Sequence, residues 1–191
     1  MITINKVKTY HDKDIIEAGA GLGLEKVSAY AMEAGLSGFE FACGIPGTLG
    51  GAIVMNAGAY GGELSHVLTE VKVLCSDGSI KWKKKCELEL GYRKSNILEN
   101  KEIVLAARLK LTYGDREKIK ATVIDLNNRR KEKQPLEYPS AGSTFKRPEG
   151  YFAGKLIYLF NRGNPAPAGS GKHTVGLSDF PSRKIFCGGY P

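Results

Sequence analysis

A glycine-rich run between Gly38 and Gly62 constrains this chain more than any other feature of its sequence. Eight residues of the run are glycine, and Glu40 is its one charged residue. Because glycine has no Cβ, such a run lets main-chain N–H groups approach a neighbour closely and adopt positive φ angles that other residues avoid. Loops of this kind often bind phosphate groups, and they equally form turns between packed elements. Composition alone gives these two interpretations similar weight.

The composition is that of a globular protein. The chain has 191 residues, of which 42% are hydrophobic, enough to build a core in one large domain or two small ones. It contains no apolar run long enough to cross a membrane, and Met1–Lys6 lacks the layout of a signal peptide. We therefore expect a cytoplasmic protein with no membrane partner.

The formal net charge of +8 raises the question of a nucleic-acid partner. The basic residues gather mainly in Lys81–Lys85 and Arg129–Lys133, and no nucleic-acid recognition motif accompanies them. We predict no nucleic-acid partner, since a nucleotide diphosphate would be attracted by the same positive field. Lys83–Lys85 is expected to be a solvated hairpin edge, where lysines discourage edge-to-edge pairing.

The cysteines and histidines are widely scattered. They are Cys43, Cys75, Cys86 and Cys187, and His11, His66 and His173. A metal site needs several convergent ligands, often with short spacings such as Cys-x-x-Cys, so we predict no metal site. The cysteines are better explained as buried small hydrophobic residues.

Hydrophobic periodicity predicts a mixture of strands and helices. Strands are expected at residues 14–20 and 103–112, and a hairpin at residues 67–83 with its turn at Asp77-Gly78. Helices are expected at residues 23–35 and about 115–130. The predicted apolar face of the first helix is Leu24, Val27, Tyr30, Ala31 and Ala34, and that of the second is Ile119, Val123, Ile124 and Leu126.

The change to helical periodicity after residue 112 marks a candidate domain boundary. Gln134-Pro135 should end the second helix, because proline disfavours helical geometry in the residue before it. Residues 157–191 show no sustained period of either kind and are expected to be irregular.

The glycine-rich run fits neither familiar nucleotide-binding fingerprint. No Gly-x-Gly-x-x-Gly follows a predicted strand, and no Gly-Lys-Ser/Thr closes a phosphate loop. However, Gly44–Ala52 followed by Asn56–Glu63 resembles the flavin-contacting segment of UDP-N-acetylenolpyruvoylglucosamine reductases, the MurB family of peptidoglycan precursor synthesis. Two further motifs, Glu89–Ser95 and Pro139–Pro148, follow in the order of that family. Through these motifs the chain is identified as a member of the family.

The resemblance implies an α+β fold. Residues 1–112 would form the second half of an FAD-binding domain of the PCMH or vanillyl-alcohol-oxidase type, and residues 113–156 the start of an α/β substrate-binding domain. The family reduces the enolpyruvyl ether of UDP-N-acetylglucosamine to UDP-N-acetylmuramate, with FAD as cofactor and NADPH as hydride donor. The implied partner is therefore a small UDP-sugar.

The resemblance also implies roles for particular residues. Arg93 matches the active-site arginine, whose planar fork suits a carboxylate, and Ser143 matches the proton donor. Taken alone, Arg93 could be a surface arginine, Ser143 a turn residue and Tyr92 a half-buried core tyrosine. The implied flavin contacts are Ile45, Pro46, Gly47, Gly50, Gly51, Asn56 with its side-chain amide, Gly58 and Ala59. The implied substrate contacts are Tyr60, Tyr92, Lys133 and Lys146.

The chain departs from the family pattern at both ends. No Gly-x-Gly-Ser-Asn turn, which in the family wraps the cofactor diphosphate, precedes Gly38, so an N-terminal FAD subdomain is expected to be missing. The resemblance stops after Leu156, and no glutamate after Glu149 matches the third catalytic residue. An out-of-frame tail or a fragment would explain the sharp ending.

Weak or absent turnover is expected, because catalytic residues act as a unit. A non-catalytic remnant that keeps a flavin- or UDP-sugar-contacting surface is the alternative, and another FAD oxidoreductase of the same superfamily is a third. Apolar surface exposed by truncation could mediate aggregation or dimerisation, and the sequence leaves the oligomeric state open.

Overall fold

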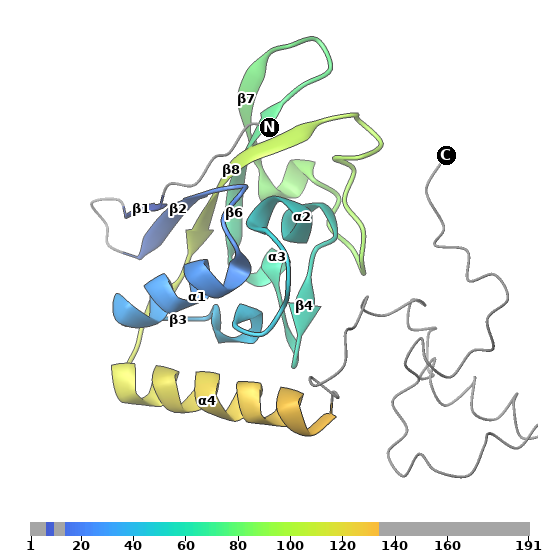
Figure 1. Ribbon diagram of the computed structural model, residues 1–191. Helices are drawn as coiled ribbons and strands as arrows, with labels where there is room; N and C mark the ends of the chain where they lie inside the picture. Colours follow the sequence, from blue (N-terminus) through green and yellow to red (C-terminus); the bar gives the residue numbers. More distant parts are fainter. Residues whose placement is uncertain (1–6, 10–13, 134–191) are drawn as a thin grey trace, which may run out of the picture. The chain divides into compact units, whose positions relative to one another are not determined.

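A five-stranded antiparallel sheet organises the computed structural model, which describes residues 7–9 and 14–133 (Figure 1). The strand order is β1-β2-β8-β6-β7, and every pairing is antiparallel. The strands are β1 (Val7–Thr9), β2 (Ile15–Gly19), β6 (Leu68–Leu74), β7 (Ile80–Lys84) and β8 (Ile103–Lys110). The predicted α+β class, both predicted strands and the predicted hairpin are thus confirmed.

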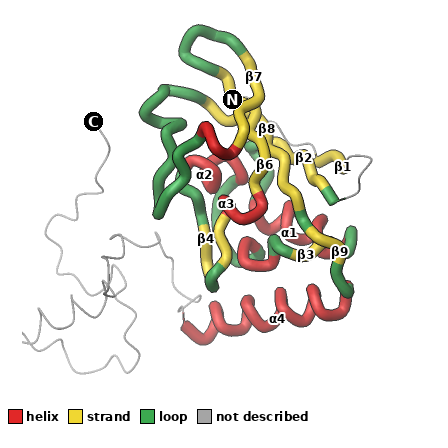
Figure 2. The backbone as a smooth tube through the Cα atoms, turned by 180° about the vertical axis from the view of Figure 1, so that it is seen from behind, coloured by secondary structure: helices red, strands yellow, loops and turns green. Residues whose placement is uncertain are grey.

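Short elements surround this sheet. The helices are α1 (Leu24–Glu33), α2 (Leu49–Val54), α3 (Leu64–Val67) and α4 (Arg116–Lys133), with 3₁₀ turns η1 (Glu40–Ala42) and η2 (Lys85–Glu87). Two small antiparallel pairs join β3 (Leu36–Ser37) to β9 (Thr112–Tyr113), and β4 (Gly58–Ala59) to β5 (Gly62–Glu63). Seen from behind in Figure 2, the β3–β9 pair lies between the main sheet and α4.

One hydrophobic core joins the sheet to α1 and α2. Strand residues alternate between the two faces of a sheet, and Ile16, Val71 and Leu109 are fully buried on the inner face. The predicted apolar face of α1 is confirmed: Leu24, Val27 and Ala31 are buried, and the other two members pack against the core. Gly35, just past the helix, has φ +71°, which fits its predicted capping role.

The outer face of the sheet is held by an arginine shared between two carboxylates. Arg108 Nε lies 2.9 Å from Glu17 Oε2, and its Nη1 lies 2.7 Å from Glu70 Oε2. The guanidinium also lies 4.1 Å from the ring centroid of Trp82. These contacts tie four neighbouring strands together in one register.

Lys83 corrects the predicted solvated edge. Strand β7 is an edge strand, and Lys84 and Lys85 are exposed as expected. Lys83, however, takes the inward position and is buried, with its Nζ 2.6 Å from Glu102 Oε1. The pair exists because Glu102 directly precedes β8, and a buried ammonium requires such a partner.

Helix α4 extends three residues beyond the predicted end at Arg130 and faces the core with a narrow stripe. Ile119 and Leu126 are buried, but the predicted core residue Ile124 is 51% exposed. Ile124 follows Ile119 by five residues, which places it about 140° away around a helix of 3.6 residues per turn. Its assignment to the apolar face was wrong for this reason.

The predicted burial of the cysteines is wrong for Cys86. Cys86 is exposed, because it lies in η2 directly after the edge strand, whereas Cys43 and Cys75 are partly buried. Burial raises the pKa of the Cys43 thiol. Cys187 lies outside the described residues.

The described chain up to Arg130 forms one compact unit, and a second unit comprises residues 131–191. The predicted domain boundary after residue 112 stays a prediction. Over residues 7–9 and 14–133, no helix has the length and apolar character needed to cross a bilayer.

Replacing Lys83 by alanine should cost about 3–5 kcal/mol of unfolding free energy, because it leaves the Glu102 carboxylate buried without its partner. Urea denaturation of the full chain would measure this loss. The exposed neighbour Lys84→Ala serves as control and should stay within about 0.5 kcal/mol of the parent protein. Equal values for the two variants would contradict the structural role of the buried pair.

Candidate functional site

The candidate site lies where the end of the glycine-rich run meets the loop that carries Arg93. Strands β4 and β5 form a tight hairpin, and its two central residues, Tyr60 and Gly61, have φ +53° and +83°. Positive φ at both positions is typical of a type I′ turn. A Cβ on Gly58 would lie 2.5 Å from Gly62 O, so this hairpin closes only around glycine.

Arg93 is presented to this hairpin by a second tight turn. Gly91 and Lys94 exchange both of their backbone hydrogen bonds, with N–O distances of 3.0 and 3.2 Å, and Arg93 has φ +55°. Arg93 Nη2 donates to Gly58 O at 3.1 Å. The structure therefore brings together the two motifs that the sequence placed more than thirty residues apart, and Arg93 is partly buried.

Asn56 joins the hairpin to the arginine turn. Its side chain is buried, and its Nδ2 donates to Glu63 Oε1 at 3.2 Å and to Gly91 O at 3.1 Å. Its Oδ1 accepts the N–H of Ser65 at 3.0 Å. Both N–H groups of the amide that was predicted to reach a flavin are thus engaged by the protein itself.

Glu63 holds the other side of this network. Its Oε1 accepts a short hydrogen bond from Ser65 Oγ in addition to the bond from Asn56. The Ser65 hydrogen bond is the main cause that lowers the pKa of Glu63, and Asn56 and the positive charges of His66 and Arg93 act in the same direction. Glu63 therefore stays ionised, and keeps accepting these hydrogen bonds, at pH values below those at which a glutamate ordinarily becomes protonated.

The first part of the glycine-rich run uses its glycines mainly for packing. Gly50 N donates to Ala20 O at 2.9 Å, and a Cβ on Gly50 would lie 3.0 Å from the Ala20 Cβ. Gly51 N donates to Thr48 Oγ1, the N-cap of α2, at 3.4 Å. The backbone N–H groups of these two predicted flavin contacts therefore donate hydrogen bonds within the protein. Ile45 does the same, since its N–H donates to Ala42 O at 3.1 Å.

Bare backbone remains at two turns. Gly47 has φ +120°, and Gly61 is the second residue of the hairpin turn; a Cβ on either would meet nothing within 4 Å. Pro46 beside Gly47 is exposed. The η1 turn contacts both β4 and β5, and Phe41 in η1 packs against Gly62 so closely that a Cβ there would lie 2.6 Å from its ring.

Aromatic side chains stand exposed beside the hairpin. Tyr60 is 45% exposed and Tyr92 is 57% exposed, so Tyr92 is not the half-buried core tyrosine of the alternative interpretation. The Arg93 guanidinium lies 5.3 Å from the Tyr92 ring centroid. Gly58 and Ala59 form β4, directly before Tyr60.

The remaining predicted residues are not placed. Ser143 and Lys146 lie outside the described residues. Lys133 is the last residue of α4, and its side chain is not described. Glu63 and Ser65 carry the network but were not predicted, although an acid directly after Gly61-Gly62 in a nearly uncharged motif was a usable signal.

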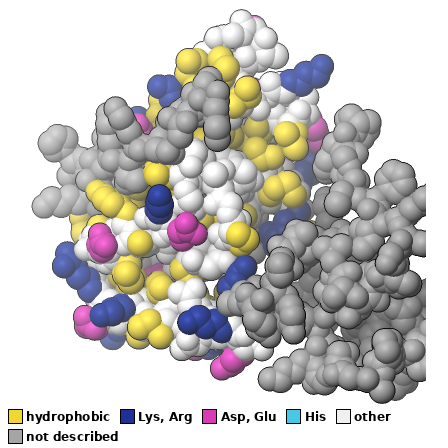
Figure 3. Space-filling model, in the orientation of Figure 1, with side chains coloured by type: hydrophobic (Ala, Val, Ile, Leu, Met, Phe, Trp, Pro, Cys, Tyr) yellow, Lys and Arg dark blue, Asp and Glu magenta, His cyan; other side chains and the backbone are white. Residues whose placement is uncertain are grey.

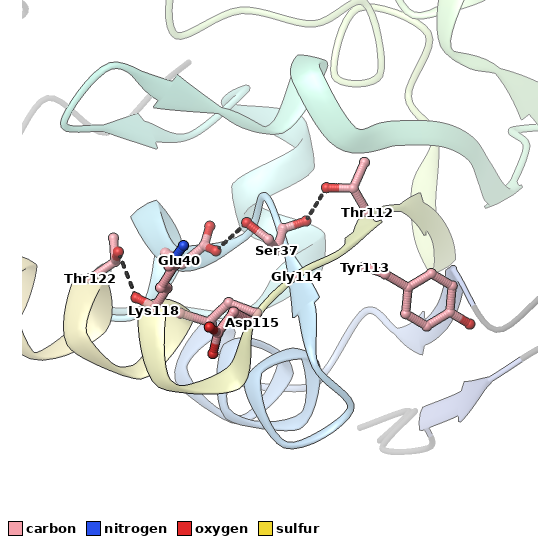
Figure 4. A pocket seen from close by; sticks show the side chains of 9 residues that line it. Ser37, Glu40, Thr112, Tyr113, Gly114, Asp115, Lys118 and Thr122 are labelled. Atoms are coloured by element: carbon pink, nitrogen blue, oxygen red, sulfur yellow. Dashed lines mark hydrogen bonds between the residues drawn. The ribbon is translucent and has the colours of Figure 1, made fainter.

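A separate small pocket of about 240 Å³ lies beside the start of α4 (Figure 4). Glu40 lines it, but both of its carboxylate oxygens already accept bonds, from Ser37 Oγ at 2.7 Å and Gly38 N at 2.8 Å. None of the predicted site residues lines this pocket. Over the described part of the chain, no three His, Cys, Asp or Glu side chains converge as metal ligands.

Gly58→Ala should destabilise the protein by about 1–3 kcal/mol, because the added methyl group overlaps Gly62 O across the hairpin. Gly51→Ala is the matched control, since a Cβ there meets only Thr48 Oγ1 at 3.7 Å and alanine favours a helix by about 0.5–1 kcal/mol over glycine. Urea denaturation would compare the two. A harmless Gly58→Ala would show that the hairpin is not closed as described.

Glu63 should make stability depend on pH in acid. Because its folded pKa lies below the ordinary value of 4.5, the stabilisation is present above that value and disappears as the pH falls through the folded pKa. The difference in unfolding free energy between the parent protein and Glu63→Gln should therefore be constant near neutral pH and shrink below about pH 4. A difference that does not vary with pH would exclude this contribution.

Comparisons with known proteins agree with the fold and with the motifs. The sequence profile of the FAD binding domain family matches residues 1–83. The UDP-N-acetylenolpyruvoylglucosamine reductase of Clostridium botulinum (strain Eklund 17B) is 56% identical over 146 residues, which are 76% of this chain and 48% of that protein. The enzyme of the same name from Agathobacter rectalis is 60% identical over 143 residues, which are 75% of this chain and 46% of that protein.

A solved structure shows the same similarity in three dimensions. The UDP-N-acetylenolpyruvylglucosamine reductase (MurB) of Thermus caldophilus matches with a TM-score of 0.70 and 40% identity, over 80% of this chain and 55% of that chain. The chain spans about half the length of the curated relatives it matches. Over the half that it spans, this chain belongs to the family of UDP-N-acetylenolpyruvoylglucosamine reductases.

Proposed function

We propose that this protein binds FAD and reduces the enolpyruvyl ether of UDP-N-acetylglucosamine to UDP-N-acetylmuramate, with NADPH as hydride donor. The reaction would supply cytoplasmic peptidoglycan synthesis and thereby cell shape and division. The observation that carries the proposal is the hydrogen bond from Arg93 to Gly58 O, which places a partly buried guanidinium on the hairpin of the flavin motif. The chain spans about half the length of these relatives, and the activity of the whole protein is part of the proposal.

The described residues fit a flavin at this place. The bare backbone at Gly47 and at Gly61 leaves room for a ligand to approach the main chain, and Tyr60 offers an exposed ring. Backbone contacts of Pro46, Gly58 and Ala59 are proposed to complete the contact surface. When bound, the flavin would supply the hydride that adds to one carbon of the enolpyruvyl double bond.

Arg93 is proposed to hold the substrate carboxylate. A guanidinium carries five N–H groups, and the structure shows one hydrogen bond of this group, to Gly58 O. Its planar fork can therefore bind a carboxylate and stabilise the negative charge that develops on it during hydride addition. Tyr60 and Tyr92, both exposed beside Arg93, are proposed to contact the substrate.

The remaining roles rest on the family resemblance. Ser143 is proposed to give the proton that goes to the carbon next to the carboxylate, and Lys133 and Lys146 to attract the substrate diphosphate.

Basic side chains on the face in Figure 3 are interspersed with acidic and apolar ones, which favours a small anionic ligand over an extended nucleic acid.

A second candidate function is that of a non-catalytic binding module. The open backbone at Gly47 and Gly61 could contact a flavin or a UDP-sugar without catalysis of the reaction. Flavin retained without substrate-dependent NADPH oxidation would favour this non-catalytic binding module.

The visible absorption spectrum of the full chain with FAD tests the proposal. The parent protein should shift the flavin band, and adding the enolpyruvyl UDP-sugar should perturb it further. Arg93→Lys should weaken this second step about tenfold or more, because lysine cannot make the bidentate contact, while the exposed neighbour Lys94→Ala should not. Folded protein that leaves the flavin spectrum unchanged would contradict the proposal for this chain.

A further inference from the structure

We infer that Asn56 and Glu63 form a positioning pair that holds Arg93 in place for the substrate carboxylate. The inference rests on the proposed function and extends it to two residues that touch no ligand themselves. Asn56 was expected to contact the flavin, but both N–H groups of its amide bond to protein acceptors. Asn56 lies between the hairpin and the Gly91–Lys94 turn, so its amide connects these two segments.

The Gly91–Lys94 turn is attached to the hairpin segment at two points. One is the Arg93 bond to Gly58 O, and the other is the Asn56 bond to Gly91 O. The first point involves the side chain that must also bind the substrate, so this attachment depends on how the guanidinium is oriented. The Asn56 bond holds the turn independently of what the guanidinium binds.

Glu63 fixes which way the Asn56 amide faces. An amide rotated by 180° would point its oxygen at the Glu63 carboxylate and at Gly91 O, and its N–H groups at the N–H of Ser65. The amide oxygen would then face two other acceptors, Glu63 Oε1 and Gly91 O, and the amide N–H groups would face the N–H donor of Ser65. The Ser65 hydroxyl in turn donates a hydrogen bond to Glu63 Oε1, so in the observed orientation each of these donors meets an acceptor.

The backbone supports the same assignment. Asn56 has φ +40°, Tyr60 +53° and Arg93 +55°, which are conformations that residues other than glycine rarely adopt. Such conformations are strained and persist where the surrounding structure determines them. Asparagine is among the residues that tolerate this region, so at position 56 it meets the backbone and the hydrogen-bonding requirement together.

The first test uses Asn56→Asp in the full chain, which keeps the side-chain shape and replaces the N–H donors with an oxygen. In the absence of any ligand, amide hydrogen exchange at Gly91 and Lys94 should accelerate about tenfold or more, because the turn loses one of its two attachments to the hairpin segment. Asn96→Asp is the matched control. Asn96 is also buried, but its Nδ2 donates to Glu87 O.

The second measurement is specific for the position of Arg93. Asn56→Asp should lower affinity for the enolpyruvyl UDP-sugar about tenfold and leave affinity for UDP-N-acetylglucosamine, which lacks the carboxylate, unchanged. Asn96→Asp should show no such selectivity. Glu63→Ala should lower the affinity for the enolpyruvyl UDP-sugar as Asn56→Asp does. Glu63→Gln keeps an acceptor oxygen and should retain most of the parent affinity. These two variants provide the test if Asn56→Asp does not fold.

Unchanged exchange at Gly91 and Lys94 in the folded variants would overturn the inference, as would equal losses for both ligands. If the parent protein binds neither flavin nor UDP-sugar, the proposed function fails. The exchange measurement then still decides whether Asn56 and Glu63 position the turn.

Discussion

Close approach of a neighbour to the main chain, possible only where a side chain is missing, is the constraint on which the described structure depends. Gly50 lets α2 pack against the end of β2 at Ala20, Gly58 lets the β4–β5 hairpin close, and Gly62 lets that hairpin pack on Phe41. Each contact would place a Cβ 3.0 Å or less from a neighbouring atom. These glycines therefore allow the fold to assemble, and the turns at Gly47 and Gly61 leave space for a ligand to approach the backbone.

The difference between glycines that pack against neighbours and glycines that face open space explains how far the sequence could predict the site. The family resemblance assigned Arg93 and the glycine-rich run to one active site, and in the structure Arg93 donates a hydrogen bond to Gly58 O of that run. The sequence could not separate packing glycines from ligand-facing ones, because the difference lies in neighbours such as Ala20 that are distant along the chain. Asn56 was assigned to the flavin for the same reason, since its partner Gly91 lies thirty-five residues further along.

The fold shows the same pattern of success and failure. Periodicity predicted α1, α4 and the hairpin, because each depends on local spacing, whereas the short helices α2 and α3 were not predicted. The assignments of Ile124, Lys83 and Cys86 were wrong, since which residue faces the core depends on the partner element. Lys83 is buried because Glu102 supplies a carboxylate, and no local pattern announces that pairing.

The stacking on the outer face of the sheet has a practical consequence. Trp82 is the single tryptophan of the chain, and Arg108 and Lys72 lie over its ring at 4.1 and 5.9 Å. Its indole is carried by β7, while the two cations belong to β8 and β6, so the ring environment exists only when three strands are paired. Intrinsic fluorescence is therefore a built-in reporter of sheet integrity, read at one position without any added label.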